Sequence, residues 1–217
     1  MKGGGSKMRL VAERIERYAD RYTPKVEKVF ESLRKETYAR CNNPGMQVGK
    51  VEGAFLRMLV AISGARRVVE VGTFTGYSAL MMASALPEDG ILYTLEHDQA
   101  RAEVAQRYFD KVSYGSRIRI VLGDANESLR YIEAPIDMFF IDADKPGYDQ
   151  YYERALELLR PGGIMALDNM LWKGEVLRPR GKDAKAIHAI NRKISRDERV
   201  DAVLLTVRDG VTLVRKR

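Results

Sequence analysis

Two short apolar segments of this 217-residue sequence end abruptly in carboxylate or amide side chains. Asp142 follows the apolar run 138–141, and Asp168 and Asn169 follow the run 164–167. In a parallel sheet such runs are buried strands whose carboxyl ends open onto the binding crevice, so these three side chains are predicted to meet there. For either segment alone, the alternative interpretation is that Asp and Asn simply begin a loop.

The oxygen atoms of these side chains suit a hard cation. Two carboxylates and one amide carbonyl favour Mg²⁺, with Mn²⁺ or Ca²⁺ as alternatives, and disfavour soft metals. The sequence has only two histidines and one cysteine, which argues against a zinc site. Lys145 stands three residues beyond Asp142, where a neutral amine can act as a general base. The alternative interpretation of Lys145 is a surface ion pair with Asp144 or Asp149.

The elements that must position these residues alternate between strand and helix. Strands separated by helix-length crossovers predict a parallel, doubly wound α/β sheet. Two β-rich runs around Asp209-Gly210, at 202–207 and 211–214, predict a C-terminal hairpin that adds an antiparallel strand. The predicted parallel strands are 68–71, 91–96, 118–122, 138–141 and 164–167, and the predicted helices between them are 77–86, 99–112, 125–132 and 148–160.

The part of the chain before the sheet divides into three pieces. Residues 1–6 are predicted to form a flexible tail, and residues 7–44 a helical segment interrupted at Pro24. A further helix ends near Gly64, and the sheet domain is predicted to span 45–217. The N-terminal helical segment is not needed for the sheet, and we expect it to cover the acceptor site.

Composition excludes some classes of protein and leaves others open. A content of 45% hydrophobic and 31% charged residues is ordinary for a soluble globular domain, and no apolar run is long enough for a membrane span. A single cysteine, Cys41, suits a reducing cytoplasm. The net charge of +7 can attract nucleic acid, but the basic residues are scattered, so a solvated surface is the alternative interpretation.

The segment from Glu70 to Ser78 has the pattern of a buried strand, a glycine turn and a helix start. It lacks the Gly-x-Gly-x-x-Gly spacing that seats a pyrophosphate, and the Glu70 carboxylate suits a ligand with an ammonium or sulfonium group. Glu96 ends the next predicted strand, where a carboxylate holds a ribose diol, and the segment 123–125 supplies an edge for adenine. Ribose, adenine and a cationic amino-acid tail together describe S-adenosylmethionine.

From residue 45 to residue 217 the chain resembles the cation-dependent, catechol-type O-methyltransferases, which include plant caffeoyl-CoA and bacterial members. The resemblance rests on the segments 47–53, 70–78, 140–145, 159–163 and 168–172. It implies a Rossmann-like class I methyltransferase fold, with a mostly parallel seven-stranded sheet, an antiparallel C-terminal hairpin strand and helices on both faces.

The resemblance also implies roles for individual residues. Lys145 is implied to be the catalytic base and Trp172 to shape the acceptor pocket. An acidic residue that grips the second hydroxyl in some catechol enzymes has no clear counterpart. Asp209 is a candidate, but its place in the hairpin turn explains it equally well. The implied metal ligands are Asp142, Asp168 and Asn169, and the implied cofactor-binding residues are Val48, Glu70, Gly72, Ser78, Glu96, His97, Ala125 and Asp142.

The resulting hypothesis is a Mg²⁺-dependent methyl transfer from S-adenosylmethionine to a small vicinal dihydroxy aromatic acceptor. Two vicinal hydroxyls bound to one divalent cation become more acidic, by the logic that makes metal-bound water acidic. One alternative keeps the cofactor and metal but takes hydroxylated uridine in tRNA as the acceptor. A second is a binding or scaffold protein that retains only the fold. The resemblance further implies a homodimer.

Overall fold

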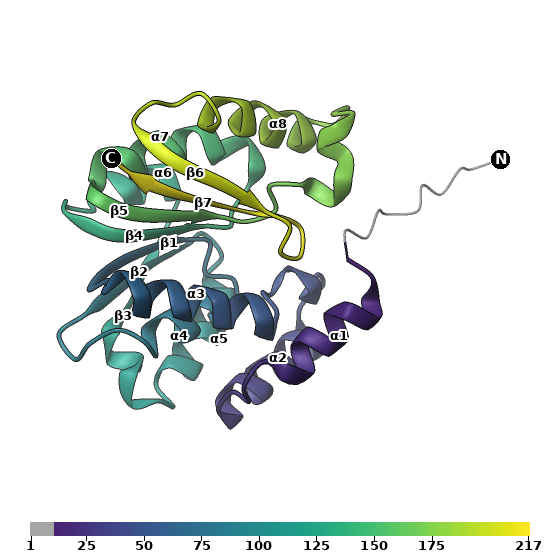
Figure 1. Ribbon diagram of the computed structural model, residues 1–217. Helices are drawn as coiled ribbons and strands as arrows, with labels where there is room; N and C mark the ends of the chain where they lie inside the picture. The colour runs from purple at the N-terminus through teal and green to yellow at the C-terminus, as the bar shows by residue number, and fades with distance from the viewer. Residues whose placement is uncertain (1–10) are drawn as a thin grey trace.

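The computed structural model describes residues 11–217 and contains one seven-stranded sheet (Figure 1). The tail predicted at 1–6 and the start of the helical segment predicted from residue 7 lie outside the described residues. The strand order is β3-β2-β1-β4-β5-β7-β6. The strands are β1 Arg67–Val71, β2 Ile91–Glu96, β3 Ile118–Leu122, β4 Ile136–Ile141, β5 Leu159–Leu167, β6 Val200–Leu205 and β7 Val211–Lys216.

The sheet confirms the predicted topology. Strands β1 to β5 pair in parallel, whereas β7 is antiparallel to both of its neighbours, β5 and β6. Strand order reverses at β1, which lies between β2 and β4. In open α/β sheets the binding crevice forms at this switch point, beyond the carboxyl ends of the strands. Val71 and Ile141 are paired at these ends, which places Gly72 beside Asp142.

Helices cover both faces of the sheet, as predicted, and separate the apolar residues into two clusters. One cluster lies under α2, α3, α4 and α5, and the other under α6, α7 and α8 (Figure 1). The helices are α1 Glu13–Tyr22, α2 Lys28–Arg40, α3 Lys50–Ser63, α4 Tyr77–Ala83, α5 Gln99–Phe109, α6 Ala125–Arg130, α7 Tyr148–Leu158 and α8 Lys182–Ile194. Short 3-10 turns lie at Pro44–Met46, Ser113–Arg117, Lys145–Gly147 and Trp172–Leu177.

The local sequence explains most of these boundaries. Pro24 lies in the break between α1 and α2, and α3 ends at Gly64, whose left-handed backbone (φ 63°) favours glycine. The helix predicted at 148–160 ends two residues early, because Leu159 is already extended and pairs with Ile136 of β4. Strand β5 therefore starts at Leu159 rather than at the predicted residue 164.

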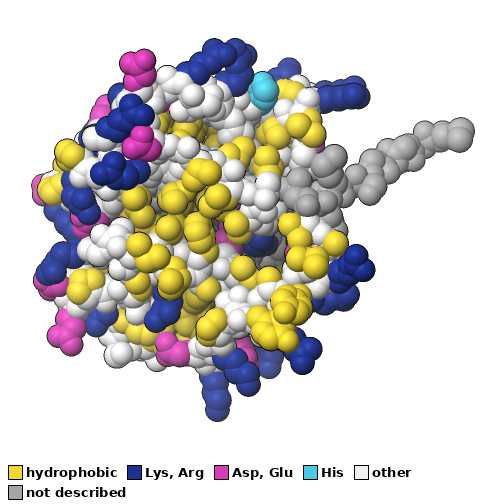
Figure 2. Space-filling model, viewed as in Figure 1, with side chains coloured by type: hydrophobic (Ala, Val, Ile, Leu, Met, Phe, Trp, Pro, Cys, Tyr) yellow, Lys and Arg dark blue, Asp and Glu magenta, His cyan; other side chains and the backbone are white. Residues whose placement is uncertain are grey.

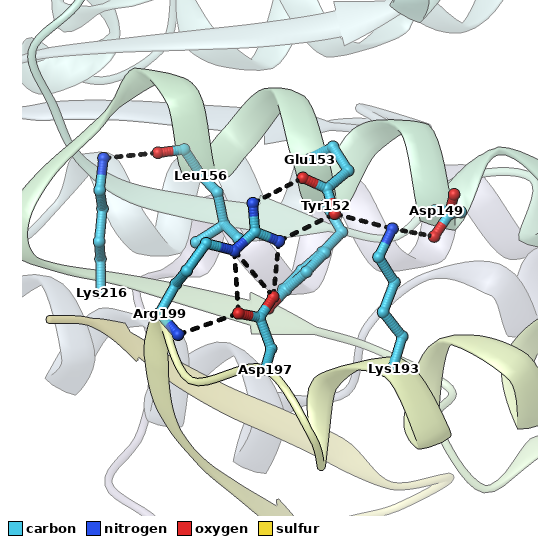
Figure 3. Close-up of polar contacts among 8 residues, drawn as sticks. All are labelled: Asp149, Tyr152, Glu153, Leu156, Lys193, Asp197, Arg199 and Lys216. Atoms are coloured by element: carbon cyan, nitrogen blue, oxygen red, sulfur yellow. Dashed lines mark hydrogen bonds and ion pairs between the residues drawn. The ribbon is translucent and has the colours of Figure 1, made fainter.

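An ionic network fixes the hairpin edge of the sheet against α7 and α8 (Figure 3). Arg199 lies 2.6 Å from an Asp197 oxygen and 2.9 Å from a Glu153 oxygen, and Lys193 pairs with Glu153 at 2.7 Å. The Tyr152 hydroxyl donates to Asp197 over 2.9 Å. The Arg199 guanidinium holds the pKa of Asp197 well below its usual range. This network links the start of β6 to α7 and α8, and the turn at the other end of the hairpin lines the binding crevice.

One apolar surface remains uncovered. Figure 2 shows apolar side chains gathered over α3 and the β6–β7 hairpin. Met58, Ile62, Val203 and Leu204 are each at least 42% exposed there. No helix in residues 11–217 is both long enough and apolar enough to cross a bilayer.

Candidate functional site

A cavity of about 930 Å³ opens beyond the carboxyl ends of β1, β2, β4 and β5. This volume is in the range of small-molecule and cofactor sites. Among its lining residues are all but one of the predicted site residues, which are Val48, Gly72, Ser78, Glu96, His97, Ala125, Asp142, Lys145, Asp168, Asn169 and Trp172. The exception is Glu70. The predicted site residues follow five different strands or lie in loops, and the fold brings them together around this cavity.

The glycine turn after β1 brings two strand ends into close contact. Gly72 has a φ of 104°, and a Cβ atom there would lie 2.1 Å from the Asp142 carbonyl oxygen. Any other residue would push β1 away from β4. Gly76, with a φ of 90°, precedes α4, and a Cβ atom there would collide with the Phe109 ring. Because Gly72 has no side chain, a ligand can approach the backbone closely at this point of the cavity.

Glu96 is held rigidly at the end of β2. Its Oε2 accepts a hydrogen bond from the Phe74 backbone N–H (2.7 Å), and its Oε1 accepts from the N–H groups of His97 (3.1 Å) and Asp98 (3.0 Å). The side chain is buried, whereas the neighbouring His97 side chain is 77% exposed. A carboxylate fixed by backbone donors is suited to accept hydrogen bonds from a diol.

Glu70 lies beneath the cavity and not on its surface. It is fully buried, and the Thr94 hydroxyl donates to its Oε2 over 2.5 Å. Burial raises the pKa of Glu70 to about 8, although hydrogen bonds from Ser78 and Thr94 oppose this rise. The structure therefore places Glu70 behind Ser78, which does line the cavity. Direct contact between Glu70 and a cofactor stays a prediction.

The predicted cation ligands lie side by side at the other end of the cavity. Asp142 follows β4 and Asp168 follows β5, with Ile141 and Leu167 in register. The Asp168 carboxylate accepts from the Asn169 backbone N–H (2.6 Å) and from Asn169 Nδ2 (3.1 Å). Burial raises the pKa of Asp168 well above its usual range, and the nearby charges of Glu52 and Asp142 raise it further.

This donor set fits a hard divalent cation. Within residues 11–217 no three His, Cys, Asp or Glu side chains form a metal cluster, so the site depends on the amide oxygen of Asn169. Two carboxylates with an amide oxygen match the preferences of Mg²⁺. Behind them the buried Glu52 Oε1 atom has no hydrogen-bond partner in the described chain, and a hydrated cation would bring donors to this region.

Lys145 is buried between aromatic rings beside the predicted cation ligands. Its Nζ lies 3.1 Å from Asp142 Oδ1 and donates a hydrogen bond to the Tyr148 hydroxyl over 2.8 Å. Nζ also lies 5.7 Å from the centre of the Trp172 ring. The Tyr148 hydroxyl donates in turn to the Asp168 carbonyl oxygen (2.9 Å). The surface ion pair considered for Lys145 is therefore not observed, because its partner is Asp142 inside the cavity.

The loop after β5 has an unusual backbone. Asn169, Trp172 and Lys173 all have positive φ angles, of 58°, 43° and 55°. Such strain in residues other than glycine clusters at functional sites and requires support from the surroundings. Asp209 of the β6–β7 turn supplies that support, because its Oδ1 accepts from the Lys173 N–H (2.5 Å) and its carbonyl oxygen accepts from the Leu171 N–H (2.8 Å).

The contacts of Asp209 bear on its predicted role. We expected this residue either to grip an acceptor hydroxyl or to serve the turn. Its carboxylate already holds the Lys173 backbone, and burial raises its pKa. Asp209 also lines the cavity. The observed contacts favour the role in the turn.

The end of the N-terminal segment and the residues after it line the cavity. Residues 42–48 line it, and Gln47 Nε2 donates to the hydroxyls of Thr37 and Thr75, each over 3.0 Å. These three side chains are buried and connect α2 to the glycine turn after β1. Phe30 and Leu33 of α2 belong to the same apolar cluster as α3 and α4. The segment is therefore packed into the domain that it covers.

Three residues of the site were missed in the sequence. Tyr148 orients Lys145, and Glu52 of α3 pairs with Arg208 of the hairpin turn (2.5 Å) beside Asp168. Tyr148 is three residues after Lys145, a spacing that brings side chains together in a helical turn, so it could have been found. An acid in the first turn of a helix and an arginine in a hairpin turn are ordinary surface features, and they carry no such signal.

Comparisons with known proteins agree with this arrangement. Residues 21–217 match the model of a family described as O-methyltransferase. The chain is 37% identical to a caffeoyl-CoA O-methyltransferase from Populus kitakamiensis, over 86% of each chain. It is 36% identical to a catechol O-methyltransferase from Niastella koreensis, over 77% of this chain and 78% of that one.

Solved structures give the same result. The O-methyltransferase TomG from Streptomyces achromogenes, in complex with SAM, matches with a TM-score of 0.86 and 28% identity, over 94% of this chain and 96% of that one. An O-methyltransferase from Bacillus cereus, in complex with SAH, matches with a TM-score of 0.87 and 29% identity, over 94% of this chain and 97% of that one.

The burial of Glu70 predicts a pH dependence of stability in the ligand-free protein. The pKa of Glu70 is about 8 in the folded state and 4.5 in the unfolded state. Between these pH values the folded protein keeps a proton on Glu70 that the unfolded chain has released. The free energy of unfolding then falls by about 1.4 kcal/mol per pH unit between these values. Glu70→Gln should remove this slope, so the variant should gain stability over the wild type as pH rises from 5 to 8.

Urea unfolding at several pH values measures this difference. Glu88→Gln, at an exposed glutamate, is the matched control and should run parallel to the wild type. Parallel curves for Glu70→Gln and the wild type would contradict the assignment of a protonated Glu70.

Proposed function

Because this chain belongs to the O-methyltransferase family, we propose that it transfers a methyl group from S-adenosylmethionine to a hydroxyl group of a small catechol-type acceptor. The observation that carries the proposal is the single cavity in which the predicted cofactor, cation and base residues meet. The similarity to caffeoyl-CoA and catechol O-methyltransferases supports the acceptor class.

The methyl donor is proposed to bind at the end of the cavity formed by β1 and β2. Glu96 would accept hydrogen bonds from the ribose hydroxyls, with His97 and Ala125 beside the adenine ring. Gly72, Ser78 and Val48 would hold the methionine part, whose sulfonium then points toward Asp142. The fixed Glu96 carboxylate and the close backbone approach at Gly72 support this orientation.

The acceptor is proposed to bind between Lys145 and Trp172. The neutral amine of Lys145 takes the proton of the acceptor hydroxyl, and the oxygen attacks the methyl carbon as the carbon–sulfur bond breaks. The products are the methyl ether, S-adenosylhomocysteine and the Lys145 ammonium. The hydrogen bond to Tyr148 holds Nζ in place, and positioning of this kind contributes roughly 7–11 kcal/mol in well-oriented reactions.

Asp142, Asp168 and Asn169 are proposed to hold a Mg²⁺ ion. When bound, this ion acts as a Lewis acid that makes chelated hydroxyls more acidic. Asp142 has a second task, because it also accepts from the Lys145 ammonium after the proton has moved. The charges of Glu52 and Asp142 beside Asp168 support a place for a positive charge there.

A tRNA acceptor is the alternative proposal, and it rests on the net charge of +7. Lys173 and Arg208 at the acceptor end of the cavity are compatible with either kind of acceptor.

We further propose a homodimer and a cytoplasmic location. The exposed apolar surface of α3 and the hairpin supports the dimer, as do Ile15, Tyr18 and Tyr22 of α1, each at least 54% exposed. The single cysteine supports the location.

The first test of the function is transfer of labelled methyl groups from S-adenosylmethionine to caffeic acid, with Mg²⁺ or with EDTA. We expect labelling with Mg²⁺ and its loss with EDTA. Bulk tRNA is tested in parallel at several salt concentrations, because tRNA binding is steeply salt-dependent. Labelling of tRNA alone would favour the alternative acceptor, and catechol labelling that survives EDTA would contradict the cation.

Lys145→Ala tests the base. General-base catalysis contributes typically 10²–10⁴-fold, so kcat should fall by about that factor, and small primary amines added to the medium should restore part of it. Lys173→Ala is the matched control, because its Nζ also lies near Trp172, 5.1 Å from the ring centre, but it has no proposed role in proton transfer. Unchanged turnover in Lys145→Ala would refute this role.

Sedimentation equilibrium tests the dimer. We expect a mass of twice 24.6 kDa for the wild type. A charge introduced by Tyr18→Lys on the apolar side of α1 should shift the protein toward the monomer, whereas Arg14→Ala on the same helix should not. A monomeric wild type would remove the proposal, and a dimer that withstands Tyr18→Lys would place the contact away from α1.

A further inference from the structure

The turn of the β6–β7 hairpin brings a cationic side chain to the cavity. Arg208 lines the cavity, and its side chain is 40% exposed. Its φ is 47°, a left-handed conformation that residues other than glycine rarely adopt. A turn that only connected two strands would be less strained with glycine at this position. Strain of this kind at a residue that lines a cavity is typical of a functional side chain.

Two neighbouring segments fix the place of Arg208. The turn packs on the loop that carries Trp172, because the Asp209 carbonyl oxygen accepts a hydrogen bond from the Leu171 N–H over 2.8 Å. On its other side the guanidinium lies against the start of α3, where a Cβ atom on Gly49 would be 3.6 Å from Nη1. Arg208 therefore lies at the end of the cavity where the acceptor is proposed to bind.

Only part of the guanidinium group is used within the protein. Nη1 donates to Glu52 Oε2 over 2.5 Å, and in residues 11–217 this is the one hydrogen bond that the group makes. A guanidinium has five N–H groups in a planar fork. The Glu52 side chain is 1% exposed, whereas Arg208 lines the cavity. The remaining N–H groups are therefore available to a ligand in the cavity.

The charges around Arg208 favour one kind of anion. A guanidinium binds a carboxylate or a phosphate through paired, charge-assisted hydrogen bonds. Glu52 already shares the charge of Arg208, and the side chains of Asp183 and Asp209 line the same cavity. These carboxylates repel a doubly charged phosphate more strongly than a singly charged carboxylate. A carboxylate is therefore the better partner for the free part of the fork.

We infer that Arg208 is a specificity-determining residue, which selects catechol-type acceptors that carry a carboxylate group over neutral acceptors of the same shape. This inference rests on the proposed function and deepens it, because it assigns a charge to the acceptor. The carboxylate binds to the guanidinium fork of Arg208, and the hydroxyl groups at the opposite end of the acceptor stay beside Lys145.

A comparison of two acceptors tests this role. Caffeate carries a carboxylate, and caffeic acid amide is neutral and has nearly the same shape. The measured quantity is the ratio of kcat/KM for caffeate to kcat/KM for the amide, which does not depend on the fraction of folded enzyme. The wild type should prefer caffeate by about 10- to 100-fold, the range of a hydrogen bond to a charged group. In Arg208→Gly the ratio should fall close to one, mainly through a higher KM for caffeate.

Two further variants separate this role from neutralisation of Glu52. If Arg208 only neutralised Glu52, its removal would affect both acceptors equally and leave the ratio unchanged. Glu52→Gln removes the buried charge but keeps the arginine, so it should keep the preference for caffeate. The double variant Glu52→Gln/Arg208→Gly leaves no buried carboxylate unpaired, and it should lose the preference. Arg208→Lys keeps the charge without the fork and should have an intermediate ratio.

Acceptor binding provides a readout that does not require turnover. Trp172 is the only tryptophan of the chain and lines the cavity, so quenching of its fluorescence should report binding of either acceptor in the presence of S-adenosylhomocysteine and Mg²⁺. Arg208→Gly should weaken binding of caffeate by about 10- to 100-fold and leave binding of the amide unchanged.

Arg101→Gln is the matched control. It removes a positive charge from another part of the same cavity, where Arg101 lies 5.3 Å from the centre of the Phe74 ring, and it should leave the ratio unchanged. A ratio that is the same in Arg208→Gly and in the wild type, with both acceptors still methylated, would overturn the inference alone. A wild type that methylates neither acceptor would overturn the proposed function and, with it, the inference.

Discussion

The structure depends on keeping several buried or partly buried carboxyl groups close together at one edge of a parallel sheet. Each group has a different form of compensation. Glu96 accepts three backbone N–H groups, Asp142 faces Lys145, and Glu52 is paired with Arg208. Glu70 is too deeply buried for a counter-charge, so burial raises its pKa instead. Because an unpaired buried charge costs several kcal/mol, these partners restrict which loops can surround the cleft.

The C-terminal hairpin is the element through which this restriction acts over a distance. Asp209 supports the strained loop after β5, and Arg208 reaches back to the first turn of α3. The hairpin is held in the sheet by the pairing of β7 with β5, and the network around Arg199 and Asp197 links its other end to α7 and α8 (Figure 3). The turn of an ordinary antiparallel hairpin thus supports the loop after β5 and lines one end of the cavity.

The two ends of the cavity are built differently. At the end formed by β1 and β2, Gly72 allows close backbone packing and backbone N–H groups hold the Glu96 carboxylate. At the other end, Trp172 and Lys173 line the cavity and have positive φ angles. This division suits the proposed function, in which one methyl donor can serve acceptors of different shapes. For this reason the methyl donor and the chemistry follow from the sequence more readily than the acceptor does.

The sequence by itself determined the alternation of strands and helices, the antiparallel hairpin and the order of the site residues, because apolar period, glycine turns and strand-end carboxylates are local features. The features that the sequence did not predict depend on contacts between residues far apart in the chain. The early start of β5 depends on pairing with β4, and the burial of Glu70 depends on the layers above it. The contact between Glu52 and Arg208 exists only because the folded hairpin turn comes to rest on α3. Only the tertiary structure could decide these points, since charge pairing across 156 residues leaves no periodic signal in the sequence.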